Sequence, residues 1–186
     1  MKTRSQVMIN TSCSEIALGH SLILHASAVS IKKRGLLFLG HSTSGKSTIS
    51  KLLSSKFPLI SDDKVEVVRN CNKDWLLINR EFKSDSRQNL SGFVDNSPML
   101  PIVAVLRIFK SSKNGTEPAS PLDSCKFLLD AVFEIDSQRR CEDLTTRMRW
   151  FSQVSEIARN IPGYYLTFKK DFSIVKLIDR RFNSGV

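Results

Sequence analysis

The stretch LLFLGHSTSGKST, Leu36 to Thr48, decides the fold that we expect for this chain. Its first four residues are apolar and lie between a turn and a glycine, which is typical of a short strand inside a sheet. Residues 47–56 then carry apolar side chains at helical spacing, and Pro58 ends this helix. A strand, a glycine-containing loop and a helix in this order predict an α/β fold.

Between this strand and this helix, Gly40-x-x-x-x-Gly45-Lys46-Ser47 fits the pattern G-x-x-x-x-G-K-[ST] of phosphate-binding loops. Glycines let the backbone wrap closely around phosphates, and the helix adds the positive end of its dipole. Lys46 would reach the β- and γ-phosphates of a nucleotide, and the hydroxyl of Ser47 would bind Mg²⁺. The residues that we assign to nucleotide binding are Gly40, Thr43, Ser44, Gly45, Lys46, Ser47 and Thr48.

A pair of adjacent aspartates, Asp62 and Asp63, follows the short apolar segment Leu59-Ile60. An acid at the end of a strand can hold Mg²⁺ or act as a base close to the γ-phosphate of a nucleotide. Neighbouring side chains of a strand point to opposite faces, so only one aspartate enters such a site unless the chain bends there. We expect the strand that precedes the aspartates to lie beside the strand that leads into the glycine-containing loop. This position favours a functional pair over two solvated aspartates.

Three histidines are present, and His25 is the one with a possible role in the site. It lies in LHASAV, within a segment from Ser21 to Ile31 that is rich in β-formers and predicts a strand. By itself, a histidine in a strand is more often structural than catalytic. His41 occupies a variable position of the glycine-containing loop, where a side chain is expected to face solvent.

Beyond residue 64 the sequence predicts strands and then mainly helices. Strands are expected at 65–69, 75–79, 101–110 and 164–168, and helices at 122–133, at 142–160 and after Asp171. The polar segments 80–98 and 111–121 are predicted as loops. One face of the longest helix is expected to carry Leu144, Met148, Phe151, Val154 and Ala158. We therefore expect a single α/β domain over residues 1–186, with a polar lead-in at 1–15.

Composition limits the classes of partner. The formal net charge of +10 favours anionic partners, but no zinc-finger, RNA-recognition or homeodomain signature accompanies it, so nucleic acid is not expected. The four cysteines form no CxxC pair, so we expect free thiols. No apolar run approaches the roughly 20 residues of a membrane helix, and the start of the chain lacks the apolar stretch of a signal peptide. We expect a cytoplasmic protein without a membrane partner.

Taken in this order and at this spacing, LHASAV, LLFLGHSTSGKST and LISDD resemble the catalytic domain of the HPr kinase/phosphorylase family. The resemblance implies a phosphate-loop fold related to phosphoenolpyruvate carboxykinase, with a mixed β-sheet like that of the HPr kinase C-terminal domain. It implies that Asp62 is the base that takes the proton of a serine hydroxyl, and that Asp63 assists at the metal. His25 would stand near the phosphates or near Asp62. ATP and Mg²⁺ are the implied cofactors, and a homo-oligomer is expected.

A further signature of that family, Glu-Val-Arg-Gly-Leu-Gly, supplies another metal contact and helps to dock the protein substrate. It has no counterpart here, where the corresponding region reads INREFKSDSRQN. The chain therefore resembles the small HPr-kinase-like proteins, some of which phosphorylate a serine of a peptide precursor and others a small molecule. The reverse phosphorylase activity is not expected.

We expect a phosphotransferase that moves the γ-phosphate of ATP to a hydroxyl, first of all that of a serine in a protein or peptide. Its catalytic residues would be Asp62, His25 and Lys46. A kinase for a small molecule such as free serine stays open, and so does a nucleotide-binding module that transfers nothing. The candidates for an arginine that stabilises the transferring phosphoryl group are Arg80, Arg87 and Arg107.

Overall fold

The computed structural model describes residues 21–79, 98–136 and 143–183 of the chain. The strands in these ranges are β1 (Leu22–Ile31), β2 (Arg34–Leu39), β3 (Leu59–Ser61), β4 (Lys64–Arg69), β5 (Trp75–Ile78), β6 (Met99–Lys110), β7 (Gly115–Ala119) and β8 (Gly163–Phe168). The helices are α1 (Lys46–Leu53), α2 (Pro121–Asp136), α3 (Leu144–Asn160) and α4 (Ser173–Ile178), and a π-helical turn, η1 (Asp179–Asn183), follows α4. The predicted α/β class with a mixed sheet is confirmed.

Five of the strands close into a barrel. β1 pairs with β2 and β4, β4 pairs with β5, and β5 pairs with β6, all antiparallel, while β6 returns to β2 in parallel. β3 adds to β1, and β8 and β7 extend the sheet beyond β6. The length of β1 allows this closure, because residues 22–25 pair with β4 whereas residues 26–31 pair with β2.

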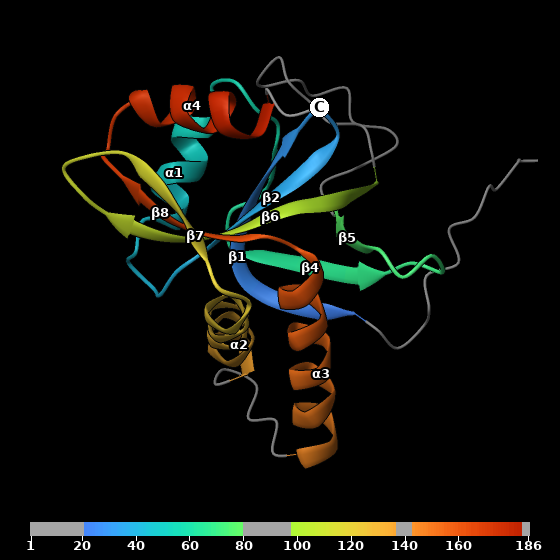
Figure 1. Cartoon of the computed structure of the whole chain (residues 1–186). Helices are drawn as coiled ribbons and strands as arrows, with labels where there is room; N and C mark the ends of the chain where they lie inside the picture. The colour runs from blue at the N-terminus through green and yellow to red at the C-terminus, as the bar shows by residue number, and fades with distance from the viewer. Residues whose placement is uncertain (1–20, 80–97, 137–142, 184–186) are drawn as a thin grey trace, which may run out of the picture.

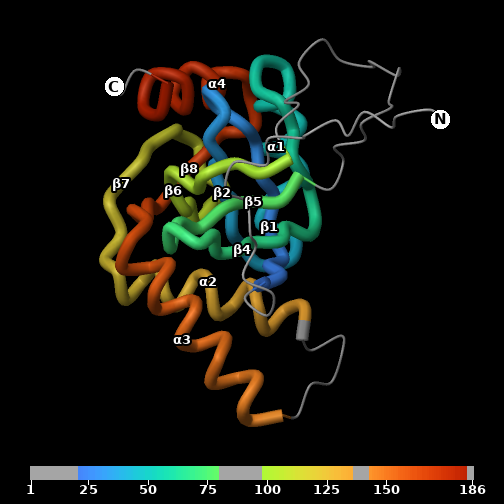
Figure 2. The backbone as a smooth tube through the Cα atoms, turned by 90° about the vertical axis from the view of Figure 1, so that its right-hand side faces the viewer, coloured from blue at the N-terminus to red at the C-terminus, as the bar shows by residue number. Residues whose placement is uncertain are grey.

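Helices cover both sides of this sheet: α1 and α4 lie on one side, and α2 and α3 lie side by side on the other (Figure 1 and Figure 2). β2 contributes to both cores, since Leu37 and Leu39 pack in the cluster that contains α2 and α3, whereas Leu36 and Phe38 pack in the cluster that contains α1 and α4. Alternate strand residues point to opposite faces, so a continuous apolar run suits a strand that is covered on both sides. Burial of β2 on both faces therefore explains why the strand before the loop is a continuous apolar run.

The hairpin between β1 and β2 sets the position of the candidate site. Lys32 and Lys33 form its two-residue turn with φ angles of 49° and 59°, and such left-handed pairs match the twist of a tight hairpin. The resulting register pairs Ala26 with Leu39. His25 of β1 is thereby brought to the end of β2, where the loop begins.

One segment that the sequence predicted as a loop contains a strand. Within 111–121, residues Gly115–Ala119 form β7, which pairs antiparallel with β8. The sequence GTEPA has few strand-forming residues, and its proline is tolerated because β7 lies at the edge of the sheet. The prediction of a loop at 80–98 falls almost wholly on residues 80–97, which lie outside the described ranges, as do Arg80 and Arg87.

The predicted apolar face of the long helix α3 is only partly buried. Val154 and Ala158 lie in the core, whereas Leu144, Met148 and Phe151 are 70%, 65% and 57% exposed. The helix is confirmed, and its N-terminal end, which carries Leu144 and Met148, points away from the sheet (Figure 1). No helix of the described ranges is long and apolar enough to cross a membrane.

Candidate active site

The glycine-lysine loop, residues 40–46, runs from the end of β2 into α1. Gly45 is the N-cap residue of α1 and has a φ of 105°, a left-handed conformation that favours glycine. A Cβ atom at Gly45 would lie 2.7 Å from Cζ of Phe168, and one at Gly40 would collide with the hydroxyl of Ser44. Both glycines of the pattern are therefore required by the shape of the loop. Gly45, as the N-cap residue, has no side chain to cap α1, so it leaves the first amides of the helix to another acceptor.

Lys46 folds back onto this loop. Its Nζ donates to the carbonyl oxygens of Gly40 and His41, at 2.7 Å and 3.2 Å, and the residue is only 6% exposed. Burial lowers the pKa of Lys46; the negative charges of Glu134 and then Asp63 oppose this shift, and the positive charge of Arg107 adds to it. The loop thus holds a cation whose nearest acceptors are carbonyls, and this arrangement favours the approach of an anion.

The two aspartates form a bend between strands. β3 ends at Ser61 and β4 begins at Lys64, with Asp62 and Asp63 between them. The hydroxyl of Ser61 donates to the carbonyl of Lys64 at 2.8 Å, and the backbone N–H of Ala26 donates to the carbonyl of Asp63 at 3.0 Å. Because the chain bends here, both aspartates line the same cavity, which a regular strand would not allow.

His25 lies between two carboxylates. Its Nε2 is 3.3 Å from Oδ1 of Asp63, and its Nδ1 is 2.9 Å from Oε2 of Glu134 in α2. The other carboxylate oxygen of Glu134 accepts a hydrogen bond from the backbone N–H of Ser42, at 3.0 Å. The resemblance placed His25 near the phosphates or near Asp62, and the contact that the structure gives is with Asp63. His25 connects the aspartate bend to α2 and, through Glu134, to the loop.

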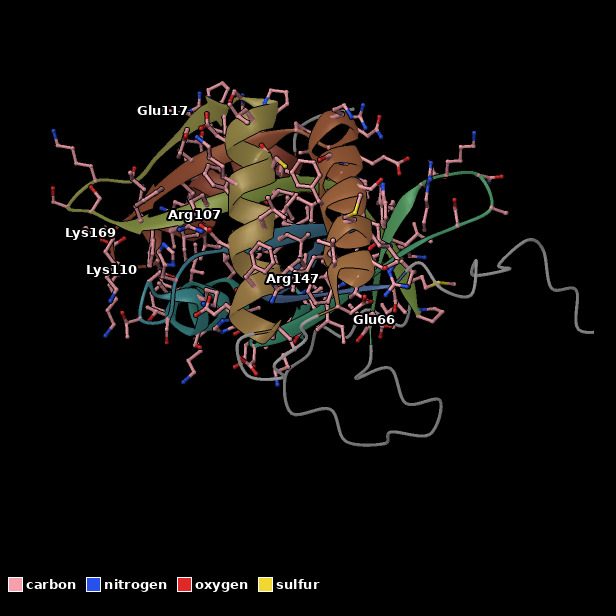
Figure 3. The ribbon with its side chains drawn as sticks, turned by 90° about the horizontal axis from the view of Figure 1, so that it is seen from below. Glu66, Arg107, Lys110, Glu117, Arg147 and Lys169 are labelled. Atoms are coloured by element: carbon pink, nitrogen blue, oxygen red, sulfur yellow. The ribbon has the colours of Figure 1, made fainter. Side chains whose placement is uncertain are left out.

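Two basic side chains of β6 lie close to the loop. Arg107 pairs in register with Leu39, the last residue of β2, and its Nη2 donates to Nε2 of His41 at 2.7 Å. His41, expected to face solvent, therefore also binds the sheet. Figure 3 shows Arg107 and Lys110 on the same side of α2. Lys110 lines the cavity, so this wall of the cavity is basic.

These elements surround a cavity of about 410 Å³. Its lining residues come from the loop, the start of α1, the aspartate bend and the ends of β1 and β6: His25, Ser42, Thr43, Gly45, Lys46, Ser47, Thr48, Asp62, Asp63 and Lys110. Of the residues predicted for the site, Gly40 and Ser44 are absent from this lining. Gly40 serves the site through its carbonyl, which accepts from Lys46.

The family described as SynChlorMet cassette protein ScmC matches residues 2–182. The chain belongs to the ScmC family. No curated protein matches it. Among solved structures, the Hpr(Ser) kinase/phosphatase from Coxiella burnetii is similar over 85% of this chain and 91% of that chain, with 14% identity and a TM-score of 0.43. A likeness this distant says nothing about the activity of this ScmC-family chain, so the resemblance to HPr kinases stays a prediction.

The site of this ScmC-family protein can be tested for its fit to Mg²⁺. In the described ranges, no group of three or more His, Cys, Asp and Glu side chains could hold a metal ion by itself. A nucleotide-bound Mg²⁺ does not need such a group, because one or two protein ligands suffice and phosphates and waters complete its shell. Ser47 and Asp63 present a hydroxyl and a carboxylate to the same cavity. Their chemistry fits a metal that arrives with its nucleotide.

Sequence reasoning missed three residues of this ScmC-family site: Ser42, Lys110 and Glu134. Ser42 occupies a variable position of the loop pattern, and the pattern alone says nothing of it. Lys110 ends a strand that was predicted, and the parallel pairing of β6 with β2 brings it close to the loop. Glu134 has no signal in the sequence, because its role depends on how α2 packs against the sheet.

Proposed function

We propose that this ScmC-family protein is a kinase that transfers the γ-phosphate of ATP to the hydroxyl of a serine in a protein or peptide. One observation carries the proposal: Lys46 and Ser47 of the loop line one cavity together with both aspartates and His25. Phosphoryl transfer needs little covalent chemistry from a protein, and it depends on positioning of the phosphates, charge neutralisation and orientation of the attacking group. The cavity brings together side chains for each of these tasks.

Each side chain has a defined task in this proposal. The amides at the start of α1 and the ammonium of Lys46 bind the β- and γ-phosphates. Ser47 and Asp63 hold Mg²⁺, which neutralises charge on the phosphates when it is bound. Asp62 accepts the proton of the attacking hydroxyl. At the same time the hydroxyl oxygen bonds to the γ-phosphorus, and ADP leaves. His25, in contact with Asp63, orients that carboxylate.

The exposure of both aspartates supports an acceptor group that reaches the site from outside, as a serine on a peptide or protein does. The same exposure does not exclude a small-molecule acceptor, so the test must include both. Homo-oligomer formation belongs to the same proposal and can be measured by sedimentation.

The experiment is transfer of γ-labelled phosphate from ATP with Mg²⁺ to a panel of acceptors. The panel holds HPr, serine-containing peptides, products of neighbouring genes and free serine, and Asp62→Asn is the control variant. Label on one acceptor that is lost in Asp62→Asn supports the proposal and gives the acceptor class. ATP binding without label on any acceptor favours a nucleotide-binding module, and a folded chain that binds no ATP contradicts the proposal.

A further inference from the structure

Glu134 is a carboxylate that the proposed mechanism does not use, although it contacts the loop and the histidine. Its Oε1 accepts from the backbone N–H of Ser42 at 3.0 Å, and its Oε2 lies 2.9 Å from Nδ1 of His25. Ser42 and His25 both line the cavity. Glu134 therefore contacts two residues of the cavity wall from behind. Its negative charge lies against a loop that would bind an anion.

The backbone of Glu134 is held in place by packing. On the same helix, Ala131, Val132 and Ile135 are 3%, 2% and 6% exposed, and the first two belong to the core beneath α2. A buried helix face fixes the position of the Cα atoms beside it. The Cα atom of Glu134 therefore cannot move away from the loop without a shift of α2, and the contacts with Ser42 and His25 hold its carboxylate.

Glu134 also acts on the cation of the loop. Burial has the largest effect on the pKa of Lys46. Among the charges that influence this pKa, that of Glu134 has the strongest effect, and it opposes burial. The carboxylate, which binds Ser42 of the same loop, therefore acts electrostatically on the ammonium that would bind a phosphate. A nucleotide phosphate and Glu134 are both anions, and they are drawn to the same cation and to the same part of the loop. Two like charges in a partly buried site repel each other more strongly than they do in water.

We propose that Glu134 is a specificity-determining residue that makes the loop favour metal-bound ATP over metal-free ATP. This inference rests on the proposed binding of ATP at the loop. Metal-free ATP carries more negative charge than its magnesium complex, because Mg²⁺ cancels two of the negative charges. Repulsion from Glu134 therefore falls mainly on the metal-free form, while the loop and Lys46 attract both forms.

The test compares the dissociation constants of ATP with Mg²⁺ and with EDTA, measured by calorimetry for the wild type and for Glu134→Gln. Glutamine keeps the size of the side chain and an oxygen for Ser42, and it removes the charge. Glu134→Ala is the second variant, in case the amide of glutamine makes new contacts. Glu117→Gln is the matched control, because Glu117 is exposed on β7 and lies at the opposite end of α2 from the loop (Figure 3).

We expect Glu134→Gln and Glu134→Ala to bind metal-free ATP at least about fivefold more tightly than the wild type, with a smaller gain for magnesium-ATP. Glu117→Gln should match the wild type in both measurements. If the folded Glu134 variants bind metal-free ATP no more tightly than the wild type, while the wild type binds magnesium-ATP, this inference alone is overturned. If neither the wild type nor any folded variant binds ATP, with Mg²⁺ or with EDTA, the proposed function fails together with this inference.

Discussion

Arg107 of β6 donates from Nη2 to Nε2 of His41 at 2.7 Å, and this bond joins the middle of the sheet to the glycine-lysine loop. Arg107 is only 7% exposed. Its Nη1 lies 3.3 Å from Oδ2 of Asp130, and its Cζ lies 5.6 Å from the centre of the Phe127 ring. A planar cation with three different partners has little freedom to move. The loop is thus fixed by a side chain that belongs to another strand.

This relationship predicts energetic coupling between Arg107 and His41. We expect Arg107→Met and His41→Phe to be less destabilising together than the sum of their separate effects, with a coupling of about 1 kcal/mol, because each variant alone removes the same hydrogen bond. Urea unfolding of the wild type, both single variants and the double variant measures it. Additive effects, within about 0.3 kcal/mol, would show that the contact contributes nothing to stability.

The second prediction concerns Lys46. Lys46→Met keeps the length of the side chain and removes the ammonium, so magnesium-ATP should bind about tenfold to a hundredfold more weakly, as expected when a hydrogen bond from a charged group is lost. Calorimetry measures this change. Lys51→Met on the exposed face of α1 is the matched control, and we expect it to bind ATP like the wild type. Equal binding by Lys46→Met and wild type would remove Lys46 from the site.

Lys46 also predicts a pH dependence of stability. Because burial lowers its pKa in the folded state, the folded chain loses this proton at a lower pH than the unfolded chain does. The unfolded state then binds more protons between the folded pKa and the ordinary lysine pKa of 10.5, so stability rises with pH in that window. The wild type should therefore gain stability relative to Lys46→Met as the pH approaches 10.5. A constant difference between the two unfolding curves across alkaline pH would contradict the stated environment of Lys46.

Gly45 gives the third prediction. Gly45→Ala places a Cβ in a left-handed conformation and 2.7 Å from the ring of Phe168, so it should destabilise the chain by about 2 kcal/mol or more. ATP binding should weaken as well, because the loop must shift to relieve the contact. Thermal unfolding measures the first effect and calorimetry the second. Gly115→Ala in β7 is the control, because among the described residues its Cβ would meet only the hydroxyl of Thr167, at 3.1 Å. A loss as large there would show that the cost at Gly45 does not come from its conformation or from Phe168.

Local patterns in the sequence were enough to predict the loop, the strand before it and the helix after it. They work because an apolar run, a glycine with a required φ and a helical apolar spacing each act over a few residues. The aspartates were found in the same way. Their common orientation was not, because it depends on the bend that joins β3 to β4 and on the bond from Ala26.

The features that the sequence did not predict depend on contacts between distant segments. The closure of five strands into a barrel follows from the parallel pairing of β2 with β6, which no local pattern announces. β7 is a strand because it can pair with β8, although its own residues favour a turn. Glu134 approaches His25 and Ser42 only because α2 packs against β1; Ser42 lies 92 residues before Glu134 in the sequence. Such residues become visible only when the packing is known.

The fourth prediction tests which part of α3 supports the fold. Ile157 is fully buried and Phe151 is 57% exposed, although a helical pattern marks both as apolar. Ile157→Ala should lower the free energy of unfolding by about 2–5 kcal/mol, whereas Phe151→Ala should change it by about 0.5 kcal/mol or less. Urea unfolding of the two variants measures both changes. A larger loss for Phe151→Ala than for Ile157→Ala would contradict the observed orientation of the helix.

The fifth prediction separates the two aspartates, which are neighbours in the bend but have different surroundings. Asp63 contacts His25 at 3.3 Å, and we propose that it serves the metal, whereas Asp62 serves as the base. Asp62→Asn should therefore lower phosphate transfer by about a hundredfold or more and leave magnesium-ATP binding nearly unchanged. Asp63→Asn should instead weaken the dependence of ATP binding on Mg²⁺. Calorimetry with and without Mg²⁺, together with the labelled transfer assay, measures both variants. If Asp62→Asn transfers phosphate normally while Asp63→Asn does not, the two roles are exchanged, and the base is the carboxylate that His25 orients.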